Sequence, residues 1–322
     1  MIERVDLAAW QRFDAAHPAP TFFARPAWAV SVAEVYDSLT PCLLRIQTRE
    51  RETVLLPAME QRERSFPLRR FVAFPLGAYT CFLREDGSAA SRETIESAMR
   101  ELSRFAHSAS LVPWPLGPGL SRDYAGREHR TAVVDLSGGL EAALRGVDGC
   151  YRRMAGQAER RGVECAPSSA SGAADAYYEL LRESAKRWNI PEPVERRKLI
   201  DALVRHGGND VEIWFARAGD RAVAGGVVFY GSQELFFWSA AMLVEFGRLR
   251  PSNALNLALL RAGSARGVRW FNLGSSEGLP GVARFKKDLG AHEIAYREIE
   301  LARPALRIAR GVRGALGALT GS

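Results

Sequence analysis

Residues 268–291, VRWFNLGSSEGLPGVARFKKDLGA, carry the clearest succession of elements in this chain. The apolar residues at 268–273 predict a short buried strand. Three glycines and a proline at 274–281 predict a turn, since they hold the backbone close and permit positive φ. Residues 282–289 follow as a short helix that ends at Gly290. A strand, a glycine-bearing loop and a lysine-bearing helix in this order indicate a functional site.

Apolar residues recur at helical spacing within 282–289. Val282, Phe285 and Leu289 fall on one face, so we expect Phe285 to pack inward. The neighbouring Lys286 and Lys287 are then expected to point elsewhere.

The same stretch resembles the FemAB-like and CelD-like N-acyltransferases, a branch of the GNAT-type acyltransferase superfamily. The resemblance rests on the order strand, G-S-S-x-G, then F-K-x-x-x-G, and it extends over roughly residues 20–300. The other matching motifs are FFARPAW at 22–28, TAVVDLS at 131–137, AERRGV at 158–163, KRW at 186–188 and AVAGGVV at 222–228.

This resemblance implies an α/β protein with tandem GNAT-like domains, each a mixed, mostly antiparallel sheet flanked by helices. The implied domains are residues 1–130 and 131–302, followed by a basic tail at 303–322. In the second domain the sequence predicts strands at 211–217, 222–230 and 234–241, a helix from Pro251 and a strand at 268. In the first it predicts helices at 26–38 and from Ser91, and strands at 41–49, 52–61, 71–74, 79–83 and 110–114.

Lys286 is the residue for which the resemblance implies a catalytic role. The family's F-K motif places this lysine near the transferred acyl group, where an ammonium stabilises an oxyanion or a donor phosphate. A solvent-facing lysine on an amphipathic helix is the alternative. Phe285, Ser275 and Ser276 are candidate substrate-binding residues, with turn formation as the alternative for the two serines.

The superfamily usually binds its donor at a Q/R-x-x-G-x-G/A turn, where backbone N–H groups and the helix dipole hold the CoA pyrophosphate. Here the turn at 248–254 reads RLRPSNA, without glycine and with Pro251 removing one donor. Ser252 and Asn253 are the candidate donor-binding residues. We therefore expect acetyl-CoA to bind weakly, while acyl-CoA and aminoacyl-tRNA both remain open as co-substrates.

Basic and aromatic residues elsewhere are further candidates. Arg187 and Trp188 end a predicted helix and are read as acceptor-binding residues; a core tryptophan beside a snorkelling arginine is the alternative. Arg153 belongs to a helix with several arginines, which reads either as a phosphate-binding stripe or as a solvated face.

Composition narrows the class of protein. The chain is 47% hydrophobic and 25% charged, which is enough for ordinary packed domains and argues against disorder. Its net charge of +7 is compatible with an anionic ligand such as a nucleotide or tRNA. The four cysteines form no CxxC pair, and no nucleophilic triad, P-loop, tightly bound cofactor or metal site is predicted.

The sequence thus predicts an N-acyltransferase or aminoacyltransferase that acts on an amine, for example in a cell-envelope precursor. A non-catalytic binding protein that kept the fold but lost donor binding is the alternative. The absence of a signal-like start and of a membrane-length apolar run, together with the unpaired cysteines, predicts a cytoplasmic protein, and the resemblance implies a bacterial one. The basic tail at 303–322 predicts either contact with the inner membrane or a helix docked on the protein. The oligomeric state is left open.

Overall fold

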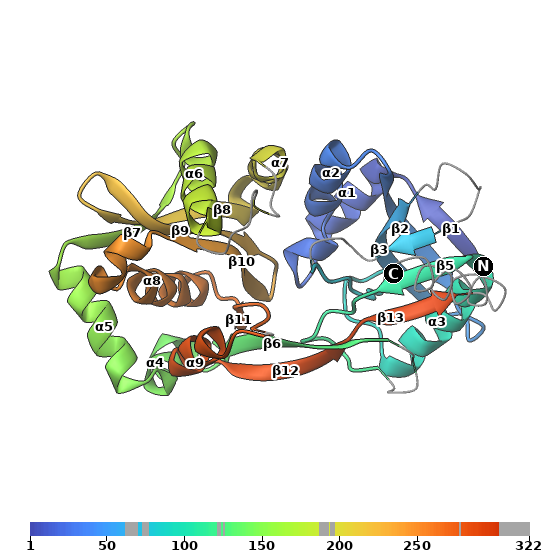
Figure 1. Cartoon of the computed structure of the whole chain (residues 1–322). Helices are drawn as coiled ribbons and strands as arrows, with labels where there is room; N and C mark the ends of the chain where they lie inside the picture. Colours follow the sequence, from blue (N-terminus) through green and yellow to red (C-terminus); the bar gives the residue numbers. More distant parts are fainter. Residues whose placement is uncertain are drawn as a thin grey trace, which may run out of the picture. The chain divides into compact units, whose positions relative to one another are not determined.

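The structure is a computed structural model that describes residues 1–61, 70–72, 77–120, 124, 126–186, 193, 197–276 and 278–302. The predicted acceptor residues Arg187 and Trp188 and the basic tail at 303–322 lie outside these ranges. The chain divides into two compact units (Figure 1). The first unit holds residues 1–18, 23–128 and the chain from Tyr296, and the second holds residues 19–22 and 129–295.

The first unit is a mixed sheet in the order β1-β2-β3-β4-β5-β13 with helices packed on it. Only β4 and β5 run parallel among these neighbours, and the other pairs are antiparallel. The last strand of the described chain, β13, therefore completes the sheet of the first unit. The elements are β1 (Ile2–Val5), α1 (Leu7–Ala16), α2 (Pro26–Val35), β2 (Leu39–Gln47), β3 (Thr53–Gln61), β4 (Arg70–Val72), α3 (Arg92–Phe105), β5 (Ser108–Leu111) and β13 (Ile299–Ala302), with the short 3-10 helix η1 (Phe22–Ala24) before α2.

Helix α3 forms where the sequence predicts it. The Ser91 hydroxyl accepts a hydrogen bond from the Thr94 N–H at 3.2 Å and so caps the first turn. Ile95, Met99 and Leu102 form the buried stripe that packs against the sheet. By contrast, residues 79–83 form isolated bridges to neighbouring segments instead of the predicted strand.

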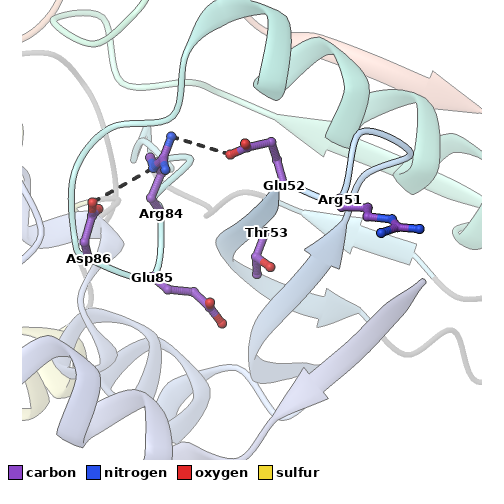
Figure 2. A pocket seen from close by; sticks show the side chains of 6 residues that line it. All are labelled: Arg51, Glu52, Thr53, Arg84, Glu85 and Asp86. Atoms are coloured by element: carbon purple, nitrogen blue, oxygen red, sulfur yellow. Dashed lines mark ion pairs between the residues drawn. The ribbon is translucent and has the colours of Figure 1, made fainter.

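A surface pocket of about 360 Å³ lies between the β2–β3 turn and the segment after residue 83 (Figure 2). Among its charged residues, the Arg84 guanidinium lies 3.5 Å from the Glu52 carboxylate and 4.0 Å from that of Asp86. Ion pairs exposed to solvent in this way contribute little, and we assign this pocket no role.

The second unit is built on a larger sheet in the order β12-β6-β11-β10-β9-β8-β7. Its elements are β6 (Glu128–Asp135), α4 (Gly139–Gly146), α5 (Gly149–Arg160), β7 (Val163–Ser168), α6 (Ala173–Lys186), α7 (Arg197–Gly207), η2 (Gly208–Asp210), β8 (Val211–Ala218), β9 (Arg221–Tyr230), β10 (Glu234–Met242), η3 (Val244–Leu249), α8 (Pro251–Ala265), β11 (Trp270–Asn272), α9 (Pro280–Asp288) and β12 (His292–Arg297).

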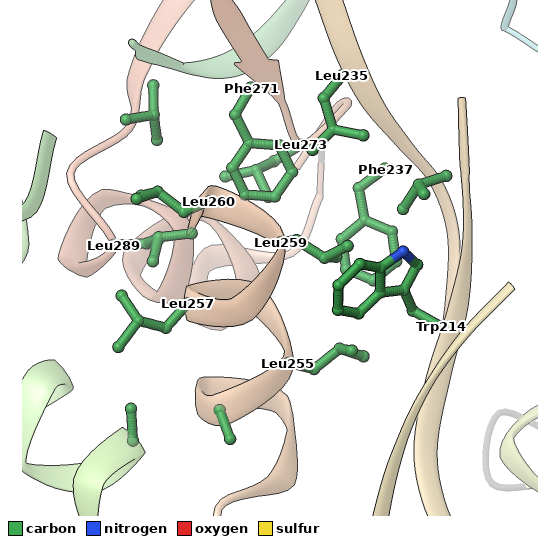
Figure 3. Close-up of a cluster of buried hydrophobic side chains, with 14 of the residues drawn as sticks. Trp214, Leu235, Phe237, Leu255, Leu257, Leu259, Leu260, Phe271, Leu273 and Leu289 are labelled. Atoms are coloured by element: carbon green, nitrogen blue, oxygen red, sulfur yellow. The ribbon is translucent and has the colours of Figure 1, made fainter. Parts of the chain in front are cut away.

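Helix α8 supplies the centre of the second core. Leu255, Leu259 and Leu260 are at most 2% exposed and pack against the sheet with Trp214 and Phe237 (Figure 3). Helix α6 packs against β8, β9 and β10, and its Tyr177 hydroxyl lies 2.6 Å from the Ser239 hydroxyl on β10. Helices thus flank the sheet, as the resemblance implies.

The two units repeat one order of elements. In the first, β2, β3 and β4 are antiparallel, α3 follows, and β5 then pairs parallel with β4. In the second, β8, β9 and β10 are antiparallel, α8 follows, and β11 then pairs parallel with β10. This repetition confirms the predicted tandem architecture.

Candidate active site

The sheet of the second unit opens beside β10. Strand β11 pairs with β10 only through residues 270–272, opposite residues 234–236. Strand β10 continues to Met242, and its register against β9 shifts between Phe237 and Ser239. An irregularity of this kind bends a strand, so the two parallel strands separate after their short paired segment. Such an opening is a place where a ligand can enter the edge of a sheet.

A buried polar network fixes the base of this opening. The Asn272 Oδ1 accepts hydrogen bonds from the Thr131 hydroxyl at 2.6 Å and from the Gly274 N–H at 2.9 Å. Its Nδ2 donates to the Glu234 Oε1 at 2.7 Å. Because Thr131, Asn272 and Glu234 are all buried, this network ties β6, β11 and β10 together where β11 ends. Sequence reasoning missed it, although the signal was a polar residue within each apolar strand.

Lys286 points inward, which corrects the expectation that it turns away. It is the buried residue of α9 at 9% exposure, whereas Phe285 is only half-buried. Its Nζ donates to the carbonyl oxygens of Gly274 at 3.0 Å and Ser275 at 2.8 Å. Burial lowers the pKa of Lys286 to about 8, and Glu293 partly opposes this shift. Lys286 therefore holds the loop after β11 and stays a cation near neutral pH.

The two predicted serines differ in their surroundings. Ser275 is exposed, while the Ser276 Oγ is buried and has no hydrogen-bond partner among the residues that the structure describes. The carbonyl of Ser275 is bound by Lys286, so the loop is held just before Ser276. A buried hydroxyl without a partner costs free energy, and the loop is held in place beside it by Lys286.

A pocket of about 420 Å³ brings three of the predicted site residues together. Ser252 and Asn253 line it from the start of α8, and Phe285 lines it from α9. The lining is completed by Met242 of β10, Gly247 of η3 and Arg250 of the turn between η3 and α8. The pocket therefore lies where β10 ends and α8 begins.

The polar side chains in and next to this pocket differ in whether they form hydrogen bonds. The Ser252 hydroxyl donates to the Met242 sulfur at 3.2 Å. The Asn253 residue is 7% exposed, yet its side-chain amide makes no hydrogen bond to any part of the chain that the structure describes. Phe285 packs its ring 5.2 Å from that of Tyr151, whose buried hydroxyl likewise has no partner within the described ranges. Burial, and secondarily the Asp288 carboxylate, raises the pKa of Tyr151, so its hydroxyl stays protonated.

The turn into α8 exposes few backbone donors. Arg250 adopts a left-handed conformation with φ 59° and ψ 39°, and its carbonyl accepts hydrogen bonds from both the Asn253 and the Ala254 N–H. Pro251 has no N–H to offer. Of the first helical positions, Ser252 alone keeps a free N–H within the described structure.

The remaining candidates lie apart from the pocket or outside the described residues. Arg153 is exposed on α5 and does not line the pocket. Arg161, the residue that caps the C-terminal end of α5, donates from Nη1 to the Arg248 carbonyl at 2.6 Å and so braces the turn before α8. Within the described ranges, no group of three or more His, Cys, Asp or Glu side chains is arranged to hold a metal ion. None of the helices described is both long and apolar enough to cross a bilayer.

One family model matches most of the second unit. Residues 148–287 match the family described as Acetyltransferase (GNAT) domain. No curated protein matches the sequence significantly.

Solved structures share the fold of the whole chain. FemX is 12% identical, with a TM-score of 0.65 over 93% of this chain and 97% of its own. The C-terminal domain of an Agrobacterium fabrum protein assigned as a lysylphosphatidylglycerol synthetase is 12% identical, with a TM-score of 0.55 over 96% of this chain and 95% of its own. A tandem GNAT protein from the clavulanic acid pathway is 10% identical, with a TM-score of 0.51 over 93% of this chain and 97% of its own.

Proposed function

With a GNAT domain at residues 148–287 and the fold of FemX as premises, we propose that the protein is an N-acyltransferase. It transfers an acyl or aminoacyl group from a thioester or ester donor to an amine. The acceptor amine attacks the donor carbonyl, a tetrahedral intermediate forms, and the thiol or alcohol leaves with a proton. The enzyme contributes chiefly by positioning both substrates and by stabilising the oxyanion.

The pocket at the start of α8 is the observation that carries this proposal. It lies beside the opening of β10 from β11 and joins the end of β10, the turn before α8 and Phe285 of α9. Its mixed lining, with apolar Met242 and Phe285 beside polar Asn253, suits a ligand that is largely apolar but carries a few hydrogen-bonding groups.

Lys286 is proposed as the charged group of the reaction. It follows Phe285 in α9, and two of its three N–H groups are bound to the carbonyls of Gly274 and Ser275. The third N–H and the positive charge support a developing oxyanion. The carbonyl of Ser275 belongs to the same peptide group as the Ser276 N–H, so Lys286 also strengthens that N–H as a donor.

The identity of the substrates is a further part of the proposal. Two structural neighbours, a lysylphosphatidylglycerol synthetase domain and a tandem GNAT protein solved without AcCoA, support keeping both an aminoacyl donor and acyl-CoA as candidates. A cell-envelope precursor is the proposed acceptor, and tRNA and an anionic membrane surface are proposed partners. The net charge of +7 is compatible with each.

The turn before α8 favours an alternative function, that of a binding protein. With a single free N–H at Ser252, donor binding is weaker than in a turn that offers several backbone amides. The alternative is a binding protein that keeps the fold without transferring an acyl group.

A donor-binding and transfer experiment separates the two. Thermal unfolding is measured with acyl-CoAs and aminoacyl-tRNA, since a ligand at 100 times its Kd adds about 2.7 kcal/mol to stability. Transfer from each stabilising donor to a panel of amines is then followed by mass spectrometry. We expect transfer by the wild-type protein and a loss on the order of 100-fold in Lys286→Ala.

Lys287→Ala is the matched control, because Lys287 is the exposed neighbour of Lys286 in the same helix. It should retain wild-type turnover. Binding of a donor without transfer to any amine would support the binding protein, and wild-type turnover in Lys286→Ala would refute the catalytic role of that residue.

A further inference from the structure

We propose that the second unit binds anionic membranes through the surface formed by α5 and the segment just before α8. We call it the arginine surface, and its members are Arg152, Arg153, Arg160, Arg161, Arg248 and Arg250. This inference rests on the proposed function, which includes an anionic membrane as a partner, and it names the surface that meets the lipid. The apolar Val244 of η3 lies beside these arginines and enters the lipid interface.

The arginine surface carries positive charge that the protein does not neutralise. All six members are exposed, and none forms an ion pair with a carboxylate in the part of the chain that the structure describes. The acidic residues that flank them in sequence are engaged elsewhere: Glu159 lies 3.2 Å from Arg261, Glu245 lies 3.3 Å from Arg221, and Asp148 caps the first turn of α5. A concentration of one sign of charge attracts an anionic partner.

The arginines of α5 lie flat along one face of the helix. Arg153 and Arg160 are seven residues apart, so they point the same way and stand about 10 Å apart along the axis. A Cβ built on Gly149 would lie 4.0 Å from the Arg153 Nη1, and one built on Gly156 would lie 3.3 Å from the Arg160 Nη1. Both guanidinium groups therefore rest over glycines, close to the helix, which suits a broad and flat partner.

The arginine surface continues from α5 onto the segment before α8. Helix α5 packs against α8 (Figure 1). The Arg161 Nη1 donates to the Arg248 carbonyl oxygen at 2.6 Å and so joins the end of α5 to this segment. Arg248 and Arg250 thus extend the charge of α5 within one unit, and their position relative to α5 is fixed by this hydrogen bond and by the helix packing.

Val244 favours a membrane over a nucleic acid as the partner. At 53% exposure it is the most exposed large apolar side chain described in the second unit, and Arg248 follows it four residues later. An apolar group among cations gains from a lipid interface, whereas a nucleic-acid duplex offers it no apolar region. Single strands are held partly by aromatic side chains on which bases stack. Here Tyr151 of α5 is buried, and the Arg221 guanidinium covers the Phe246 ring at 4.8 Å.

Arg250 connects the arginine surface to the candidate site. It belongs to this surface and also lines the pocket at the start of α8. The pocket therefore opens beside the surface that meets the membrane. An amine carried by a lipid is the class of acceptor that this arrangement favours.

Vesicle binding by the full chain tests the proposal, so that any contribution of the basic tail at 303–322 is common to all variants. Sedimentation is measured with phosphatidylcholine vesicles, with and without phosphatidylglycerol. The test variant combines Arg153→Gln, Arg160→Gln and Arg248→Gln, and leaves Arg161 in place because it braces the turn. The control combines Arg12→Gln, Arg51→Gln and Arg92→Gln, which remove equally exposed arginines without ion pairs from the described part of the first unit.

We expect the wild-type protein to bind only the anionic vesicles and to dissociate as salt rises from about 0.1 M to about 1 M, where the Debye length falls to about 3 Å. Each basic side chain near an anionic surface raises the partition coefficient about fivefold, so the test variant should lose on the order of 100-fold. The control should stay within about threefold of the wild type, since its arginines lie away from the contact.

A second pair of variants examines the apolar contact. Val244→Ser should weaken vesicle binding by about three- to tenfold, because a valine side chain is no longer buried in the lipid interface. Val204→Ser is the matched control, since Val204 is 39% exposed on α7 and lies outside the arginine surface. All of these residues are exposed, so an unchanged Tm shows that the fold of each variant is intact.

The proposal is overturned if the wild-type protein does not bind anionic vesicles at low salt, or if the two triple variants lose binding equally. It also fails if the test variant loses affinity for tRNA in a gel-shift assay while its vesicle binding is unchanged, since the surface then binds nucleic acid. Acyl transfer to soluble amines by a protein that binds no vesicles leaves the N-acyltransferase function standing. A protein that neither binds vesicles nor transfers an acyl group refutes both.

Discussion

Lys286 is a buried charge that holds the loop after β11 and, in the proposed reaction, also stabilises the oxyanion. Its ammonium is removed from water, which lowers its pKa, and is compensated by the carbonyl oxygens of Gly274 and Ser275. The same residue therefore shapes the loop that carries Ser276 and provides a positive charge. Neutralising it weakens both roles together.

The rate of acyl transfer should fall as the pH rises through about 8, because the pKa of Lys286 lies there and its ammonium is the active form. Between pH 8 and pH 9 the protonated fraction drops about fivefold. Lys286→Arg remains charged over this range. We therefore expect the ratio of wild-type to Lys286→Arg turnover to fall about fivefold, a comparison that cancels titration of the acceptor amine. A ratio that rises instead would mean that Lys286 acts as a neutral base.

At the scale of elements, the contact between β9 and β10 determines the shape of the pocket. A Cβ on Gly226 of β9 would lie 2.0 Å from the Phe237 ring and 2.6 Å from the Ser239 carbonyl oxygen. These are the two residues between which the register of β10 shifts. The glycine thus makes room for the irregularity that separates β10 from β11.

Gly226→Ala should destabilise the second unit by about 1–3 kcal/mol, the usual cost of overpacking, and should weaken donor binding. Gly146→Ala is the control, since a Cβ there meets nothing within 4 Å and the residue ends helix α4. Urea unfolding followed by tryptophan fluorescence measures the stability of both variants. Equal stability of the two variants would contradict the role assigned to Gly226.

The sequence predicts regular elements well where their pattern is local. The Ser91 cap and the stripe of α3 and the three antiparallel strands β8, β9 and β10 follow from periodicity, and all are present. The short strands β12 and β13 were not predicted, because most of their residues are exposed or only partly buried and their pairing depends on distant segments. Lys286 was predicted to point outward because helical spacing does not reveal that carbonyl oxygens of another segment accept hydrogen bonds from its ammonium.

Single residues of the candidate site could be predicted from the sequence, but their arrangement could not. Ser252, Asn253 and Phe285 were all proposed from motifs, and the fold places them in one pocket. Arg250 was not singled out, since only the fold shows that it lines the pocket and adopts a left-handed backbone conformation. The Thr131, Asn272 and Glu234 network joins three strands that are far apart in the sequence, so no local pattern shows it.

At the scale of the whole molecule, the first unit depends on the far end of the chain. Strand β13 pairs antiparallel with β5 along residues 299–302, and Ile299 is 2% exposed in the core of that unit. The first unit is therefore completed by residues that follow the second unit in sequence.

A chain that ends at Glu298 should lose protection of the β5 amides in hydrogen exchange, while a chain that ends at Ala302 keeps it. Burial of the Ile299 side chain alone contributes roughly 2 kcal/mol. The amides of β9 in the second unit serve as the internal reference and should be protected in both chains. Unchanged protection of β5 in the shorter chain would show that β13 is dispensable.

The place of β13 also affects the order in which the two units can fold during synthesis. On the ribosome, β5 emerges long before its partner, and at about 5–20 residues per second the wait lasts on the order of ten to forty seconds. During that time all of the second unit is synthesised, so it can fold first although it comes later in the sequence. The unpaired side of β5 meanwhile offers free N–H and C=O groups to any other strand. Nascent chains are thus most prone to aggregation before translation reaches β13.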